Sequence, residues 1–405
     1  MTTYTDLFTS YILNGARQAL DQVQQSQGSV PETVRIQAWH LLDYALRADE
    51  AWPQVRELLL ELAPRMEMAG YRDEWFAFLQ AGIERSIGQE DRAVTARLEL
   101  AVGQLLRLEN RYSEAEMWLE RAIANFREQS DSRGIAAVHN QLGRLCYLQN
   151  RDTDAVEQAH RALALLAEDD PERAESHFVL GMAALNQRGW QEAERQHHLS
   201  LEFRQRSRDP RTIAWAMQNI GTVLLQWSEY GGAARWSEAV RWLEQAIAIL
   251  DGLPDPYHSA VARNSLAIVH TQTGHLAEAT ALFIQAETNF QETGSPEWLA
   301  RVHNNLGLLY LRQEQAADAE RSFRAGVAIY KELGDDVAWL NTQHGIVLAL
   351  LAQARYAEAA ALCQRGLAEV EVLQKSPAQY AEKAGWYRDS LAKAQAGLME
   401  EVPGT

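Results

Sequence analysis

The stretch that decides the fold runs from residue 300 to residue 326 and reads ARVHNNLGLLYLRQEQAADAERSFRAG. Its first half carries Gly307 and Tyr310 at helical spacing, and its second half does the same with Ala319 and Phe323, across a short polar turn. Small residues let two helices approach closely, and large ones fill the remaining gap because protein interiors are close-packed. The stretch is therefore predicted to form a helical hairpin.

The hairpin recurs along the chain. The small residues of the predicted first helices are Gly103, Gly143, Gly181, Gly221, Ala267 and Gly307, at spacings of 40, 38, 40, 46 and 40. Their second-helix partners are Ala115, Ala155, Ala193, Ala239, Ala279 and Ala319, followed four residues later by Leu119, Ala159, His197, Leu243, Phe283 and Phe323. A last repeat fits Ala359 and Cys363, with either Gly345 or Val347 in its small position. Seven repeats are predicted.

The repeats divide the chain into three predicted regions. Residues 1–95 form an N-terminal helical region with a degenerate repeat near Trp75, residues 96–374 hold the seven repeats, and residues 375–405 form a capping helix and tail. Pro64 is expected to kink or break a helix. Four pairs, which join an N-cap oxygen to a proline, are predicted to start first helices: Asp170-Pro171, Asp209-Pro210, Asp255-Pro256 and Ser295-Pro296.

The pattern Leu-Gly-x2-Tyr followed by Ala-x3-Phe resembles the tetratricopeptide-repeat family over about residues 56–374. The resemblance implies an all-α, right-handed α-solenoid of antiparallel hairpins. The repeats are near 40 residues long instead of about 34, so they look like the kinesin-light-chain-like subgroup and are similar to the sensor arrays of bacterial STAND-type NTPases. The chain lacks a Gly-x4-Gly-Lys-Ser/Thr loop and a helix-turn-helix segment, so ATP switching and DNA binding do not carry over.

Composition limits the partners. Acidic residues outnumber basic ones by 55 to 38, which gives a net charge of −17 and disfavours nucleic acid and anionic membranes. No apolar run is long enough to cross a bilayer, and the N-terminus lacks a secretory or transit pattern, so a cytoplasmic location is expected. Cys146 and Cys363 are predicted to be reduced core residues.

Motifs for catalysis or metal binding are missing from the sequence. No Gly-x-Ser-x-Gly, His-Glu-x-x-His or Cys-x-x-Cys pattern occurs. His139, His177 and His303 share the fourth position of their repeats, so stacking should hold them too far apart to bind one ion. We expect packing histidines, no metal, no cofactor and no enzymatic activity.

A polar stripe is the candidate binding surface. The family resemblance implies that positions 5, 9 and 12 of each first helix line a concave groove. Here these positions hold Asn140, Arg144 and Tyr147, then Gln218, Thr222 and Leu225, then Asn264 and Thr271, then Asn304, Leu308 and Leu311. A carboxamide can satisfy the main chain of an extended peptide, whatever its sequence. Alternatively, the asparagines hydrogen-bond neighbouring helices. The carboxylate clamp of chaperone-binding members is not reproduced.

The fourth repeat carries six added residues in its turn, around Trp227 to Gly232. Trp227 and Tyr230 could form a docking lip on a flexible loop, since aromatic residues are common interface anchors. They could instead pack inside the hairpin.

These features together predict a non-catalytic scaffold or adaptor that binds another protein or an extended peptide. The alternative is a peptide-sensing regulatory or sensor subunit of a bacterial signalling or defence system.

Overall fold

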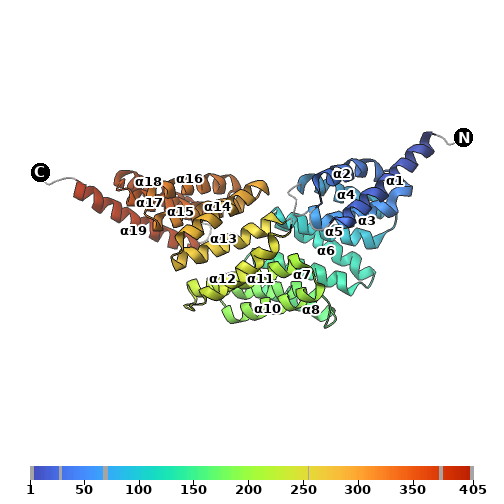
Figure 1. Cartoon of the computed structure of the whole chain (residues 1–405), viewed down its shortest axis with the longest axis horizontal. Helices are drawn as coiled ribbons and strands as arrows, with labels where there is room; N and C mark the ends of the chain where they lie inside the picture. The colour runs from blue at the N-terminus through green and yellow to red at the C-terminus, as the bar shows by residue number, and fades with distance from the viewer. Residues whose placement is uncertain (1–3, 27–29, 67–71, 254, 374–376, 402–405) are drawn as a thin grey trace. The chain divides into compact units, whose positions relative to one another are not determined.

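A computed structural model describes residues 4–26, 30–66, 72–253, 255–373 and 377–401, and all regular structure within them is helical (Figure 1). The chain divides into two compact units, Met1–Asp255 and Pro256–Thr405. The all-α prediction is confirmed. Of the described helices, none combines the length and hydrophobicity needed to cross a membrane.

Unit 1 opens with a helical region that precedes four hairpins. Its helices are α1 (Tyr4–Gln25), α2 (Glu32–Ala45), the short 3-10 helix η1 (Asp49–Ala51), α3 (Trp52–Met66), α4 (Arg72–Gly88), α5 (Arg92–Leu108), α6 (Tyr112–Glu128), α7 (Ser132–Leu148), α8 (Asp152–Leu165), α9 (Arg173–Asn186), α10 (Trp190–Ser207), α11 (Pro210–Tyr230) and α12 (Trp236–Leu250). The hairpins are the pairs α5/α6, α7/α8, α9/α10 and α11/α12. The degenerate repeat falls on α4, where Trp75 is buried.

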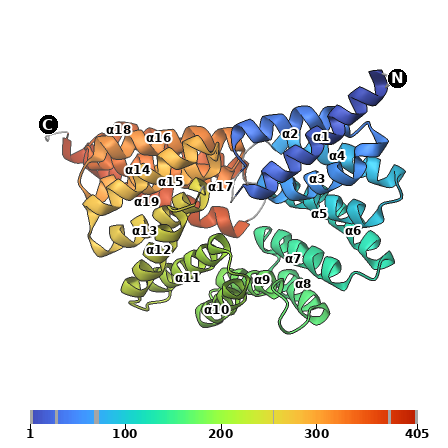
Figure 2. The same cartoon turned by 45° about the vertical axis from the view of Figure 1, so that its right-hand side comes forward.

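Unit 2 contains three hairpins and a terminal helix (Figure 2). Its helices are α13 (Pro256–Thr273), α14 (Leu276–Glu292), α15 (Pro296–Arg312), α16 (Ala316–Leu333), α17 (Asp336–Ala352), α18 (Tyr356–Val372) and α19 (Pro377–Glu401). The hairpins are α13/α14, α15/α16 and α17/α18, and α19 packs on α18.

Four hairpins place a glycine of the first helix against a larger residue of the second: Gly103 against Leu119, Gly181 against His197, Gly221 against Leu243 and Gly307 against Phe323. A Cβ added to Gly307 would stand 2.5 Å from the Phe323 ring, and one added to Gly221 would stand 2.6 Å from Leu243. Contacts this short are not tolerated, so the repeating small residue is a steric requirement of the close helix approach.

The seventh repeat inverts this arrangement. Val347 lies eleven residues after the start of α17, as Gly307 does after the start of α15, so Val347 occupies the small position. The smaller Cys363 stands where Phe323 stands one repeat earlier, and both Val347 and Cys363 are fully buried. Gly345 has a different function, because a Cβ there would also lie 2.5 Å from Phe323. Phe323 therefore packs against the first helices of two consecutive repeats.

Many of the turns recur at intervals of 20 residues. Described residues with positive φ are Glu90, Asn110, Ser130, Asn150, Arg188, Arg208, Gly232, Gly274, Gly294, Glu314, Gly334 and Ala354. A left-handed residue ends an α-helix. Each of these residues therefore stops one helix a few residues before the next begins.

The predicted helix starts differ in whether the residue before the proline caps the helix with a hydrogen bond. Asp209 accepts a hydrogen bond from the Arg211 backbone N–H at 3.1 Å, with Pro210 as the first helical residue. Ser295 precedes Pro296 but makes no capping hydrogen bond. Its Oγ lies 3.1 Å from the Thr293 hydroxyl instead. α3 continues through Pro64 to Met66, where the described residues stop.

The terminal helix α19 covers the apolar face of the last hairpin. Tyr387 is fully buried in α19, and its hydroxyl lies 2.9 Å from the Leu340 carbonyl and 2.8 Å from Gln343 Oε1, which are both acceptors. A Cβ on Gly366 of α18 would stand 2.4 Å from the Tyr387 ring. The Tyr387 ring therefore fills the space beside Gly366. In other hairpins, a large residue of the repeat itself fills the space beside a glycine.

We expect Tyr387→Ala to lower the free energy of unfolding by about 3–5 kcal/mol, because a large buried side chain is lost and a cavity remains. Tyr387→Phe should cost only about 1 kcal/mol, the net contribution of the hydroxyl hydrogen bond. Urea unfolding monitored by circular dichroism measures both values. Equal losses in the two variants would show that α19 is not a packed cap.

A buried histidine replaces the usual leucine or phenylalanine in the third repeat of unit 1. His197 is fully buried against Gly181 and Phe178, and neither ring nitrogen has a hydrogen-bond partner among the described residues. Burial, and then the positive charges of Arg204 and His198, lower the pKa of His197 to about 3. The folded chain therefore holds this imidazole neutral.

Acid should destabilise unit 1 through His197. The unfolded imidazole takes up a proton near pH 6.5, whereas the folded one does so only near pH 3. Stability should fall by about 1.4 kcal/mol per pH unit between these values, with no effect above pH 6.5. His197→Leu should remove this dependence, and His198→Leu, at the exposed neighbour, is the control. Melting temperatures at pH 7, 6 and 5 test the prediction, which fails if His197→Leu and the wild type lose stability in parallel.

Candidate binding surface

Asn140 joins two first helices of unit 1. It is fully buried on α7, its Nδ2 donates to Glu172 Oε1 at 2.8 Å, and its Oδ1 accepts from the Ser176 hydroxyl of α9 at 2.7 Å. Both ends of the amide are therefore engaged within the chain. These contacts favour the alternative in which this asparagine stabilises the stack.

The asparagines of unit 2 make equivalent contacts between first helices. Asn264 Oδ1 of α13 accepts from Asn305 Nδ2 of α15 at 3.0 Å, and Asn304 Oδ1 accepts from the Thr342 hydroxyl of α17 at 3.2 Å. The position-5 amides thus connect α13 to α15 and α15 to α17.

The two threonines of the stripe bond within their own helices. The Thr222 hydroxyl donates to the Gln218 carbonyl at 3.0 Å, and the Thr271 hydroxyl donates to the Ala267 carbonyl at 2.8 Å. Gln218 differs, because its buried Oε1 has no hydrogen-bond donor among the described residues. Gln218 is thus the stripe amide whose carbonyl stays unsatisfied.

Arg144 and Tyr147 lie in a charged cluster that joins α7, α9 and α10. Arg144 Nε of α7 is 2.5 Å from Glu175 Oε1 of α9, and Arg204 NH2 of α10 is 3.1 Å from Glu175 Oε2. The Arg144 guanidinium stacks over the Phe178 ring at 4.5 Å, and Tyr147 meets the same ring edge-on at 6.0 Å. The aromatic rings thus support the guanidinium from one side.

The charges of this cluster set the pKa values of two carboxyl groups. Burial alone would raise the pKa of Glu175, but the charges of Arg144, Arg204 and Arg107 outweigh burial and hold it below its ordinary value. Burial, and then the charge of Glu175, raise the pKa of Glu172 to about 7. Glu175 is therefore ionised at neutral pH, whereas the pKa of Glu172 lies near neutrality.

The cluster was missed by the sequence reasoning, apart from Arg144. Arg107, Arg144 and Glu175 occupy positions 12, 9 and 2 of successive first helices, so the repeat register alone could have brought them together. Arg204 lies on a second helix, where no motif marks it.

In unit 2, position 9 of α13 and positions 9 and 12 of α15 are aliphatic instead. Leu308, at position 9 of α15, leaves 44% of its surface exposed. Leu311, one turn later, and Ile268, at position 9 of α13, are half-buried. The two units therefore offer different chemistry at equivalent positions.

The insertion in the fourth repeat lengthens mainly the first helix: α11 has 21 residues where α15 has 17, and residues 231–235 connect α11 to α12 where residues 313–315 connect α15 to α16. Because α11 continues to Tyr230, Trp227 and Tyr230 lie on its last turn, and the expectation that they lie on a flexible loop is wrong. The Arg235 guanidinium covers the Trp227 ring at 5.0 Å, and a Cβ on Gly231 would stand 2.4 Å from Trp227 and 2.7 Å from Trp190. Tyr230 is 59% exposed. The added residues extend the helical hydrogen bonding by more than one turn, which a loop could not do.

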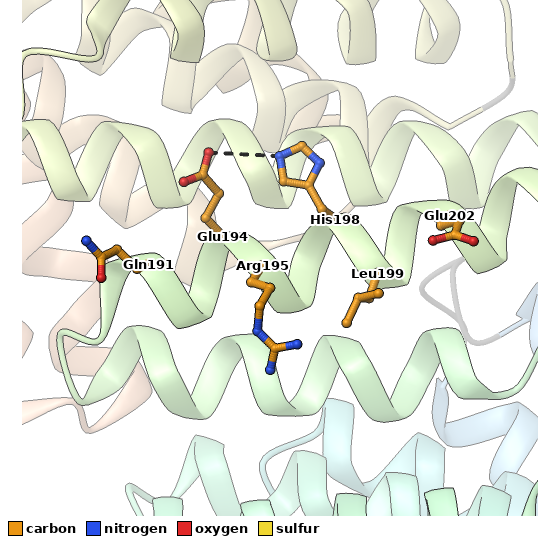
Figure 3. Close-up of a pocket in the computed structure, with 6 residues that line it drawn as sticks. All are labelled: Gln191, Glu194, Arg195, His198, Leu199 and Glu202. Carbon is orange, nitrogen blue, oxygen red and sulfur yellow. Dashed lines mark ion pairs between the residues drawn. The ribbon is translucent and has the colours of Figure 1, made fainter. Parts of the chain in front are cut away.

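A shallow depression of about 370 Å³ lies on α10 (Figure 3). It is lined by Gln191, Glu194, Arg195, His198, Leu199 and Glu202. Glu194 and His198 point to one side of the helix, 3.9 Å apart between Oε1 and Nε2, and Arg195 points to the other. No serine, cysteine or threonine nucleophile lines it. It occupies a second helix, away from the polar stripe.

The repeated histidines make polar contacts within the helical stack. Nδ1 of His139 and of His177 lies 2.7 Å from Oε1 of Gln158 and Gln196 respectively, and His303 Nδ1 lies 3.7 Å from Glu287 Oε1. Within the described residues, no three potential ligands gather in a metal-binding arrangement.

Trp227 and Tyr230 should behave differently when replaced by serine. Trp227→Ser removes a packed indole and should lower the free energy of unfolding by about 2 kcal/mol, while Tyr230→Ser should change it by less than about 0.5 kcal/mol because the ring is exposed. Chemical denaturation provides the measurement. A destabilisation by Tyr230→Ser as large as that by Trp227→Ser would contradict the packing described above.

Comparisons with known proteins address the fold. Two family models, both described as Tetratricopeptide repeat, match residues 85–168 and residues 259–286 with 299–333. No curated protein matches the sequence.

The solved structure of a Rap protein complexed with Competence and Sporulation Factor is similar to this chain, with a TM-score of 0.56, 16% identity, and coverage of 87% of this chain and all of that one. A STAND protein with a tetratricopeptide repeat sensor, from Pyrococcus horikoshii, matches with a TM-score of 0.57 and 10% identity over 86% of this chain and 52% of that chain. This chain thus spans about half of the STAND protein. Repeat register, helical pairing and the two matching models agree that the chain contains tetratricopeptide repeats.

Proposed function

We propose that this chain is a non-catalytic scaffold that binds another protein or an extended peptide through the first-helix strip of each unit. The strip of unit 1 comprises Arg144, Tyr147, Gln218 and Thr222, and that of unit 2 comprises Ile268, Leu308 and Leu311. The observation that carries the proposal is the set of side-chain hydrogen bonds between consecutive first helices. These bonds hold the helices side by side, so that positions 9 and 12 follow one another in a row.

The asparagines and Thr271 have a supporting role in this proposal. The spacing of the first helices is fixed by Asn140, Asn264 and Asn304. The backbone carbonyl of Thr271 accepts a hydrogen bond from the Arg312 guanidinium of α15. A surface held rigid in this way loses little conformational entropy when a ligand binds. Contact with the ligand is assigned to the partly exposed strip residues, which are Arg144, Tyr147 and Thr222 in unit 1 and Ile268, Leu308 and Leu311 in unit 2, whereas the buried Gln218 is not assigned a contact.

The similar Rap structure supports the proposal, because that protein was solved in complex with a factor. The sensor description of the similar STAND protein favours a second candidate, a peptide-sensing regulatory or sensor subunit of a bacterial signalling or defence system. Both candidates use the same strip, and they differ in whether binding changes the activity of a further protein. The net charge of −17 continues to disfavour nucleic acid as the partner.

Leu308→Asp tests the strip of unit 2, and Ile284→Asp is its matched control. Both side chains are exposed aliphatic residues of unit 2, at 44% and 48%, but Ile284 lies on the second helix α14. Leu308→Asp should weaken partner binding at least about tenfold, or about 1.4 kcal/mol, because a charge would be placed in an apolar contact. Ile284→Asp should leave binding unchanged.

Partner proteins are captured from a lysate of the source organism. Each captured protein is then titrated against the wild-type chain, Leu308→Asp and Ile284→Asp. Melting temperatures establish that the variants are folded. Equal loss of binding in Leu308→Asp and Ile284→Asp, or no loss in either, would reject this strip as the binding surface.

A further inference from the structure

We propose that the Nζ atom of Lys383, on the terminal helix α19, is a site of N-acylation by small acyl phosphates. The inference goes beyond the proposed function, because α19 lies outside the first helices that form the two strips. It is carried by the burial of Lys383, by the contacts of its ammonium group and by the groups around it.

Lys383 lies on the face of α19 that packs on the last hairpin. It keeps 8% of its surface exposed, and Tyr387, one turn later on the same face, is fully buried in the apolar core. Lys331 and Lys393 are exposed, and Lys375 lies outside the described residues. Lysine is seldom buried without a partner, because its ammonium group is strongly hydrated in water. Lys383 is therefore the buried lysine of the described chain.

The contact of the Lys383 ammonium group is an aromatic ring. Nζ lies 3.9 Å from the centroid of the Trp386 ring, one turn along α19. Within the described ranges of the chain, no carboxylate or hydrogen-bond acceptor pairs with Nζ. A ring face attracts a cation, but it does not satisfy the three N–H donors of an ammonium group. The charged form of Lys383 is therefore only partly compensated for the water that it loses.

The groups around this contact are basic or neutral. His344 of α17 lies against the Trp386 ring at 5.8 Å between centroids, and its Nε2 is 2.9 Å from the Ser390 hydroxyl. Burial lowers the pKa of His344, a hydrogen bond with the Trp386 backbone raises it, and the charges of Lys393 and Lys383 lower it further. Two lysine charges thus act at one place, which favours an anionic donor such as an acyl phosphate.

An amine attacks an acyl donor in its neutral form. Burial lowers the pKa of Lys383, against a smaller opposing effect of the Glu382 charge, so burial increases the fraction of neutral amine. In the reaction, the Nζ lone pair attacks the carbonyl carbon of the acyl phosphate. The new N–C bond forms as the C–O bond to phosphate breaks, and the phosphate leaves with the electron pair and takes up one proton from the amine. The products are an amide and hydrogen phosphate.

The burial of Lys383 also limits the size of the donor. Because 8% of the residue is exposed, a small electrophile can reach Nζ more readily than a large one. The amide product carries no charge, so acylation removes an ammonium group without an ionic partner from a packed face. We therefore expect acylation to strengthen the packing of α19 on α17 and α18.

The test compares lysines within the full chain. The chain is incubated briefly with acetyl phosphate at pH 7, then unfolded and acetylated completely with an isotopically heavy reagent. Mass spectrometry gives the light fraction at each lysine. The light fraction at Lys383 should be at least about threefold that at Lys331 and Lys393, whereas the three should react alike in concentrated urea. A light fraction at Lys383 equal to or below the other two in the folded chain would overturn the proposal.

A second donor tests the choice of an acyl phosphate. A small, uncharged acetyl thioester is used under the same conditions. Its preference for Lys383 over Lys331 and Lys393 should be weaker than that of acetyl phosphate, because it is not attracted by the two lysine charges. An equal or stronger preference would overturn the assignment of an anionic donor.

Two variants test whether the charge on Nζ controls the reaction. Glu382→Gln removes an exposed negative charge that favours the ammonium form of Lys383, and it should increase the light fraction at Lys383. Glu332→Gln makes the same change beside the exposed Lys331 and should leave the light fraction there unchanged, since water screens exposed charges. Equal changes at the two lysines, or no change at Lys383, would contradict the proposal.

Stability provides an independent readout. Lys383→Gln places a neutral amide in the packed face and should shift the urea midpoint of unfolding upward. Lys331→Gln, with the same change in net charge at an exposed position, should leave the midpoint unchanged. A midpoint of Lys383→Gln at or below that of the wild type would show that the packed face favours the ammonium group, and would overturn the proposal. None of these measurements involves a binding partner, so their failure leaves the proposed function unaffected.

Discussion

The contact between a small residue of each first helix and a large residue nearby sets the distance at which helices pack in this chain. Phe323 is the clearest case, since it lies in the space left by Gly307 in its own repeat and by Gly345 in the next. Every other feature depends on this spacing. The amide hydrogen bonds between first helices, the alignment of the strips and the fit of Tyr387 over Gly366 all require helices that approach without an intervening side chain.

The fold was predictable because its determinants are local and repeated. Leucine-glycine and alanine-phenylalanine pairs at constant offsets predict hairpins without any knowledge of distant contacts. The insertion after Trp227 was misjudged for a related reason. Two consecutive glycines suggested a loop, but the residues before them continue the helical pattern of α11 to Tyr230. A helix that is already formed extends at little cost, so the break falls at the glycines and not at the tryptophan.

The candidate surface was only partly predictable, because sequence position places a side chain on a helix face but does not show what it touches. Asn140 faces the expected direction, yet Ser176 and Glu172 engage both ends of its amide. The arginine cluster combines residues from first and second helices of different repeats, so no single repeat contains it.

The regular left-handed residues at the helix ends have a consequence for how such a chain can change over generations. Because Asn110, Ser130 and Asn150, and likewise Glu314, Gly334 and Ala354, divide the sequence into segments of equal length, unequal crossing-over between two such positions exchanges whole helices and preserves the phase of every contact downstream. A duplication or deletion of one hairpin therefore lengthens or shortens the first-helix strip in a single genetic step. Point substitution then needs only to adjust the side chains at its positions 9 and 12.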